Sequence, residues 1–479
     1  MHAPSAETEG TAPVAARLPA LVEGIELVGE FEDSGYRVPP QLVYRPDGQV
    51  VHLPSLLYLL VKILDGRHRA AAGKQDGPAV LNRVAKRLSR ETGRDFTAEH
   101  ITFLLDKKLA PLGITTYSDG AAPLVEKATP FLSLRFRMAV VPATGTWLLG
   151  GAFSWLFRPL VMLLVISAGV FGEVWLFTTE QTGAAVTQSL VSPGGILLVI
   201  ALAIMSSAFH EVGHAAACRY SGARPGAMGC GLYLVWPAFY TDITDSYRLG
   251  RVGRIRTDLG GVYFNVIFVV ALSALYAWTG APILLVAMLS TNLEIFQQLL
   301  PTLRFDGYYI VSDLVGIPDL FKYIGPILKR AVLRRPADER LEALKRWPQI
   351  LVTVWVLAVI PALAIQLGII LVKLPGLLRN GWQTALALGE NASAQHSTLA
   401  VIAAALQILL LTLPLAGILI LLVQLLRGLI KLARHNIAFL RPAGKGDRDR
   451  TKPGPALAVP HPSRPQAAPE DHPSSTVGG

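Results

Sequence analysis

Two histidines and a glutamate with the spacing of a metal-binding helix stand at positions 210 to 214, in the sequence His-Glu-Val-Gly-His. Residues four apart lie on one face of an α-helix, so the imidazoles of His210 and His214 could bind one Zn²⁺. Glu211 lies about 100° round the helix axis from His210, where its carboxylate could accept a proton from a zinc-bound water. The pattern therefore indicates hydrolysis assisted by one zinc ion per chain.

A catalytic zinc usually takes three protein ligands, so the two histidines need a partner from another segment. Cys218 continues the same helical stripe, but its eight-residue separation from His210 corresponds to roughly 12 Å along the axis, too far for one ion. The carboxylates of Glu294 and Asp306 remain as candidates. We favour Asp306, because it follows the inner end of an apolar segment, at a depth similar to the histidines, and Gly307 allows the chain to bend there.

The elements that must position these residues are membrane helices. Hydrophobic residues make up 52% of the 479 positions and charged residues only 16%, a composition typical of membrane proteins. Six apolar segments are near the roughly 20 residues that a helix needs to cross the hydrocarbon core. They are residues 159–178, 194–218, 259–278, 282–300, 350–372 and 399–426. The 282–300 segment is the weakest candidate, since it contains the polar side chains of Asn292, Glu294, Gln297 and Gln298.

The distribution of basic residues predicts the orientation of these spans, because Lys and Arg accumulate on the cytoplasmic side. The connections at 179–193 and 279–281 contain neither residue and 374–398 contains one Arg, whereas 219–258, 301–349 and the tail after 426 are rich in them. This alternation fits an even number of spans, with both termini in the cytoplasm and the lipid bilayer as a partner. The net charge of +10 comes with no nucleic-acid recognition motif, so we expect no nucleic-acid partner.

Residues 21–128 have the pattern of a small soluble domain. Pro46-Asp47-Gly48 forms a turn signal between two strand patterns, and three amphipathic helical patterns follow. This order fits a winged helix with a two-stranded wing, and a generic helical cap is the alternative. The predicted fold class is mainly α: a polytopic α-helical membrane protein with a small α+β winged-helix-like N-terminal domain.

The remaining segments connect or extend these two domains. Residues 129–158 are predicted to form an interfacial connector, and residues 159–440 the transmembrane domain. The 219–258 stretch within it has the pattern of a loop with strand character. Residues 1–20 and 441–479 contain too little apolar surface to offset the entropy of ordering, so we expect both ends to be disordered.

Three separated motifs follow one another along the predicted membrane helices. They are HEVGH at 210–214, GGVYFN at 260–265 and NLEIFQQLLPTLRFDG at 292–307. In this order they resemble the motifs of the site-2 protease (M50) family of intramembrane zinc metalloproteases. PAFYTDITDSYRL and RFDGYY look like its bacterial peptide zinc metalloprotease branch. Two departures stand out: Gly261-Val262 replaces the Gly-Pro of many members, and the third motif is stretched before its Asp-Gly.

The resemblance implies a role for each matched residue. His210, His214 and Asp306 would be the zinc ligands and Glu211 the general base. Asn265 would position the substrate or stabilise the oxyanion. The implied activity is hydrolysis of a peptide bond in or beside a bacterial inner membrane, in peptide maturation, export or regulated proteolysis, with a peptide or membrane protein as substrate.

The 21–128 domain is similar to PqqD-like peptide-recognition domains, which hold a leader peptide by adding a strand to the wing. The resemblance implies a leader peptide as a partner of this domain. Two other functions stay open at this point. One is a membrane-bound leader-peptide receptor or secretion partner with a structural or vestigial metal site. The other, a metal transporter, is less favoured because transport does not need Glu211 at this spacing.

Overall fold

The computed structural model describes residues 18–68, 77–124, 135–178, 183, 193–233, 236–334, 336, 338–395 and 397–440. The predicted disordered ends lie outside these residues, apart from positions 18–20, and so does nearly all of the predicted connection at 179–193. Described residues up to Ile420 form one compact unit, and a second unit begins at Leu421, within the last helix.

Five helices in this part of the chain are long and apolar enough to cross a membrane, which confirms the predicted mainly α, multi-pass fold. They are α5 (Pro159–Thr178), α7 (Pro193–Tyr220), α8 (Arg251–Thr279), α13 (Arg346–Ala394) and α14 (Thr398–Leu440). α13 runs through most of the predicted connection at 374–398, so the chain stays helical there as far as Ala394. Its residues after Pro375 include many Leu and Ala, good helix formers that let the helix continue.

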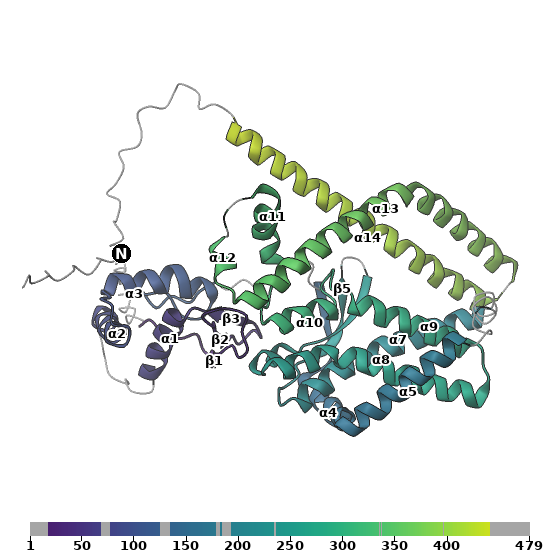
Figure 1. Cartoon of the computed structure of the whole chain (residues 1–479), viewed down its shortest axis with the longest axis horizontal. Helices are drawn as coiled ribbons and strands as arrows, with labels where there is room; N and C mark the ends of the chain where they lie inside the picture. The colour runs from purple at the N-terminus through teal and green to yellow at the C-terminus, as the bar shows by residue number, and fades with distance from the viewer. Residues whose placement is uncertain are drawn as a thin grey trace, which may run out of the picture. The chain divides into compact units, whose positions relative to one another are not determined.

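The weakest predicted span, 282–300, is the shorter helix α9 (Ile283–Leu299). Its 17 residues rise about 25 Å, somewhat less than the roughly 30 Å hydrocarbon core. α9 packs against α7 and α8, and α8 also packs against α5; Figure 1 shows these four helices side by side. The first half of α9 is buried in a cluster around Leu285 and Met288, whereas most of its second half is less buried.

The N-terminal domain contains an antiparallel sheet of three strands in the order β1-β2-β3, where two were predicted. The strands are β1 (Glu26–Glu30), β2 (Gln41–Tyr44) and β3 (Val50–Leu53), followed by α1 (Ser55–His68), α2 (Gly77–Thr92) and α3 (Ala98–Leu104). β1 lacks a clean alternation because its register shifts between Leu27 and Gly29, which hides it in the sequence. Apolar side chains from β2, β3 and the three helices form one buried core.

A second antiparallel sheet, β4-β5-β6, joins the predicted connector to the 219–258 stretch. β4 (Arg135–Val141) pairs with β5 (Met228–Tyr233), which pairs with β6 (Trp236–Thr241). The strand character of the later stretch is therefore confirmed, and part of the predicted connector belongs to its sheet. Helix α4 (Ala143–Phe153) follows β4 and packs against α7.

Three shorter helices follow α9 on the way to α13. They are α10 (Asp306–Val315), α11 (Ile324–Leu333) and α12 (Glu339–Glu342). α10 packs against α8, α9 and α13, and α8 and α9 in turn pack against the histidine-bearing helix α7.

Candidate metal centre

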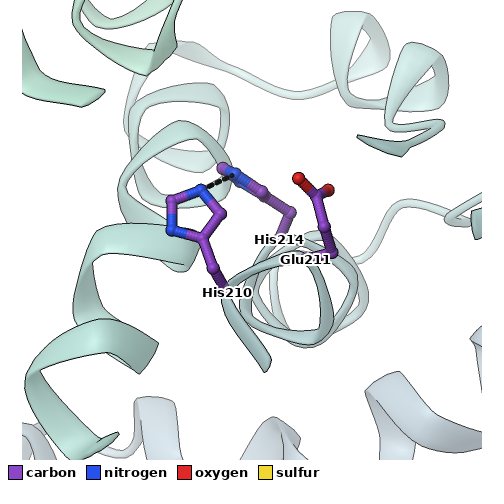
Figure 2. A group of neighbouring side chains, drawn as sticks. All are labelled: His210, Glu211 and His214. Carbon is purple, nitrogen blue, oxygen red and sulfur yellow. Dashed lines mark hydrogen bonds between the residues drawn. The ribbon is translucent and has the colours of Figure 1, made fainter. Parts of the chain in front are cut away.

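Helix α7 places His210 and His214 on one face, both almost fully buried. Their Nε2 atoms lie 3.1 Å apart, and Figure 2 shows the two rings meeting at these nitrogens. His214 Nδ1 lies 2.8 Å from the backbone carbonyl of Thr257 on α8. Because a carbonyl only accepts, His214 donates through Nδ1, which leaves Nε2 as the lone-pair atom that a metal would need.

Asp306 brings a carboxylate to the same point from the first residue of α10. Its Oδ2 atom lies 3.0 Å from His210 Nε2 and 3.4 Å from His214 Nε2. A tetrahedral zinc with bonds of about 2.0 to 2.1 Å separates its ligand atoms by about 3.3 Å. Asp306 Oδ2 has no hydrogen-bond partner within the described chain. The three atoms therefore have the chemistry and the mutual spacing that a zinc ion requires.

Glu211 lies beside this pair on the same helix and is partly exposed. Its carboxylate and the two imidazoles offer ligand atoms that all lie within 4.8 Å of one another, and Figure 2 shows the carboxylate next to His214. The Glu211 backbone carbonyl accepts a hydrogen bond of 2.9 Å from the Thr241 hydroxyl at the end of β6. The helix at Glu211 is thus fixed to the second sheet, and the carboxylate stays close to the candidate metal position.

Glycines in α7 and α8 allow the two helices to approach closely at this level. A Cβ on Gly213 would lie 2.3 Å from the Gly260 carbonyl oxygen, and one on Gly261 would lie 2.3 Å from His210 Nε2. Small residues permit such close contact between membrane helices. The two glycines that begin GGVYFN therefore have distinct roles. The absence of a Cβ at Gly260 leaves room for the backbone of α7, and its absence at Gly261 leaves room for the imidazole of His210.

Asn265 lies one turn after Gly261 on α8 and is fully buried. Neither its Oδ1 nor its Nδ2 atom has a hydrogen-bond partner among the described residues. A buried amide without partners is costly, by about 1 to 3 kcal/mol for each unmade bond. The structure thus places Asn265 on the α8 face that carries Gly261, with hydrogen-bonding capacity that the described chain does not use.

The two other ligand candidates lie elsewhere. The Glu294 carboxylate accepts hydrogen bonds from Ser206, at 3.0 Å, and Ser207, at 2.6 Å, one turn before the histidines on α7. It therefore links α9 to α7. Cys218 is a buried free thiol two turns beyond His210. Of these three candidates, Asp306 is the one that contacts both imidazoles. The contact of His214 with the Thr257 carbonyl was not predicted, because every residue has a backbone carbonyl and the sequence does not mark this one.

Comparison with known proteins shows a distant, partial homology. The chain is 25% identical over 129 residues to the protein named "Putative peptide zinc metalloprotease protein YydH" of Bacillus subtilis (strain 168). The match covers 26% of this chain and 51% of that protein, so the chain spans about half the length of this relative. No protein-family model matches the chain. No solved structure matches it significantly either.

Proposed function

We propose that this chain is a membrane-embedded zinc metalloprotease of the site-2 type, which hydrolyses a peptide bond in or beside the bilayer of a bacterial inner membrane. The observation that carries the proposal is the convergence of His210 Nε2, His214 Nε2 and Asp306 Oδ2, with distances of 3.0 to 3.4 Å between them. Two further observations support it: the Glu211 carboxylate lies close to the two imidazoles, and the chain is partly homologous to the Bacillus protein.

The residues of the site divide the work of hydrolysis. His210, His214 and Asp306 would hold the zinc ion, and the anionic carboxylate would offset part of its charge. When bound, zinc supplies a Lewis acid that lowers the pKa of water and polarises a carbonyl group. The Glu211 carboxylate accepts the proton of the attacking water and returns it to the leaving amine. Asn265 Nδ2 offers an N–H donor for the carbonyl oxygen of the scissile bond as it gains charge.

The substrate in this proposal is a peptide or a membrane protein whose scissile segment is unwound. An intact helix keeps its carbonyls in its own hydrogen bonds, so Glu211 and the metal could not reach them. The N-terminal domain would present such a peptide. Its β1 and β3 strands are the edges of the described sheet, and an extended leader peptide can add to a strand edge through main-chain hydrogen bonds.

The test replaces Glu211 by Gln in the full chain, reconstituted in lipid nanodiscs. A library of proteome-derived peptides serves as substrate, and mass spectrometry counts new termini while elemental analysis measures zinc. We expect Glu211→Gln to keep about one zinc per chain and to cleave at least 100-fold more slowly, the usual contribution of a general base. Glu294→Gln, which changes a carboxylate on a neighbouring helix, is the matched control and should retain cleavage.

Two results would contradict the proposal. If Glu211→Gln cleaves at the wild-type rate, Glu211 is not the base. If wild-type protein holds zinc and cleaves nothing in the library, a leader-peptide receptor with a structural metal site becomes the better account. Absence of zinc from the wild-type protein, with no effect of His210→Ala on metal content, would remove the metal site itself.

A further inference from the structure

Arg254 is a fully buried cation near the start of α8, with contacts to three parts of the chain. Its Nε donates to Asp313 Oδ1 on α10 at 3.1 Å. Its Nη1 donates to the carbonyl of Glu32, in the N-terminal domain, at 3.2 Å, and to the Leu249 carbonyl at 2.6 Å. The guanidinium carbon lies 4.5 Å from the centre of the Phe31 ring. Burying a charge costs several kcal/mol unless its partners are well placed, so this arrangement calls for a reason.

Helix α10 connects Arg254 to the candidate metal centre. Asp306 is the first of its ten residues, and Asp313 lies two turns later. A helix this short moves as one piece when one end is displaced, since its backbone hydrogen bonds run its whole length. The ion pair at Asp313 therefore helps to set where Asp306 lies.

The far end of α10 is held by the N-terminal domain through backbone contacts. Gly35 N–H donates to the Gly316 carbonyl at 3.0 Å. A Cβ on Gly35 would lie 2.2 Å from the Val315 carbonyl oxygen, and one on Gly316 would lie 2.4 Å from the Asp33 carbonyl oxygen. The segment between β1 and β2 thus packs on the C-terminus of α10 with no room for side chains at either glycine.

Arg254 also lies one turn before Thr257 on α8, and the Thr257 carbonyl orients His214. Two of the three candidate ligands, His214 and Asp306, are therefore positioned by helices that Arg254 joins. Groups that bond directly to a ligand commonly change metal affinity by about 10- to 100-fold when they are lost, and Arg254 acts one contact further out, through α8 and α10.

A second ion pair between the N-terminal domain and the membrane domain, Arg248–Glu26, is more exposed. Arg248 makes hydrogen bonds of 2.7 and 2.6 Å to the two carboxylate oxygens of Glu26 on β1, and the Glu26 carboxylate is 58% exposed. Exposed ion pairs contribute about 0 to 1 kcal/mol. This exposed pair therefore adds little, and the buried contacts of Arg254 and Gly35 are the ones that join the N-terminal domain to α10.

We propose that Arg254 is a positioning residue that makes metal binding at His210, His214 and Asp306 depend on the docking of the N-terminal domain. The proposal rests on the proposed function, because it takes these three residues as the zinc site. Its consequence is regulatory: a peptide that binds the N-terminal domain and shifts the segment from Phe31 to Gly35 changes the position of Asp306, and with it zinc affinity and activity.

The experiment measures zinc affinity in the full chain in nanodiscs by competition with a chelator. Gly35→Ala perturbs the contact from the N-terminal side without changing any residue of the membrane domain. Gly48→Ala is its matched control: position 48 lies in the same domain with a positive φ of 81°, but a Cβ there meets nothing within 4 Å. Arg254→Gln removes the charge from the membrane-domain side, and Arg254→Lys tests rescue by the retained charge.

We expect Gly35→Ala and Arg254→Gln to weaken zinc binding by about 10-fold, the lower end of the range for direct partners of a ligand, and Gly48→Ala to change it by less than about twofold. Arg254→Lys should recover part of the loss. In Co²⁺-substituted protein, the visible absorption of a tetrahedral site should weaken in the first two variants, while helix content by circular dichroism stays the same. A purely structural role for Arg254 would not change the cobalt spectrum.

Phe31→Leu provides a second route if Gly35→Ala does not fold, because it removes only the ring beneath the guanidinium. Wild-type zinc affinity in both Phe31→Leu and Arg254→Gln would overturn the coupling. His210→Ala sets the affinity of a broken site. If wild-type protein binds no tighter than His210→Ala, the proposed metal site itself fails. If it binds tighter and the coupling variants match wild type, only the present inference fails.

Discussion

Replacing Gly261 by Ala should displace the imidazole of His210 while leaving the helix pair largely intact. The added Cβ would lie 2.3 Å from His210 Nε2, whereas ordinary contacts of a Cβ are 3.4 Å or longer. The ring must therefore retreat by about 1 Å, several times the roughly 0.2 Å tolerance of a metal–ligand distance. Zinc would lose one of three protein ligands, and we expect its affinity to fall at least about 100-fold, beyond the effect of losing an outer partner.

Chelator competition on purified protein in nanodiscs measures this loss, and thermal unfolding measured in parallel shows whether the fold survives. Gly194→Ala is the control on α7, since its Cβ would find only a Leu399 methyl group at 3.9 Å. Gly260→Ala provides a contrast: its Cβ would lie 2.5 Å from the backbone oxygen of Gly213, which cannot move alone. That variant should lower the unfolding temperature. Wild-type zinc affinity in Gly261→Ala would refute the placement of His210 against α8.

Two further predictions concern residues away from the metal. Burial, together with the charge of Lys322, lowers the pKa of His52 to about 4 from an ordinary 6.5. The unfolded chain therefore binds the proton more readily than the folded chain does. The free energy of unfolding should be unchanged above about pH 6.5 and fall by up to about 3 kcal/mol between pH 6.5 and pH 4. His52→Phe, which keeps the aromatic contacts with Phe31 and Tyr247, should abolish this loss in denaturation measured across that range, and an unchanged slope would contradict the assignment. Glu294→Ala should lower the unfolding temperature in nanodiscs more than Glu294→Gln. Gln keeps one oxygen that accepts from a serine hydroxyl and gains an NH₂ group that can donate to the other hydroxyl, whereas Ala loses both bonds, at about 1 kcal/mol each. Equal effects would show that these bonds do not stabilise the packing of α9.

The membrane helices and the histidine pair could be predicted from the sequence because both depend on local pattern. Apolar runs of about 20 residues and a spacing of four each reflect the geometry of one helix. Helical rise also removed Cys218 from consideration, and depth within the membrane favoured Asp306 over Glu294. The structure brings Asp306 to the imidazoles, while Glu294 binds two serines.

Other features depend on contacts between distant segments or on backbone atoms, which leave little trace in the pattern. The sequence does not reveal β1 because its register shifts between Leu27 and Gly29, and it does not reveal β4 because the partner strand lies in the 219–258 stretch. Any residue at position 257 would offer the same backbone carbonyl, so the sequence does not mark this contact. Arg254 was counted among the basic residues of a cytoplasmic connection, although it is buried against Phe31 and Asp313. Its burial is a tertiary property.

The contact between the Phe31–Gly35 segment and α10 has a consequence for the order of folding during synthesis of the chain. The N-terminal domain has its own buried core, and domains near the N-terminus fold first as the chain leaves the ribosome. Gly35, however, bonds to Gly316, and its carbonyl accepts from Lys345 N–H, about 300 residues later. Docking therefore waits until four of the six apolar helices, α5, α7, α8 and α9, have been made. Until then, a nascent chain would carry a folded but undocked N-terminal domain, and Asp306 would not yet be held in place beside the histidines.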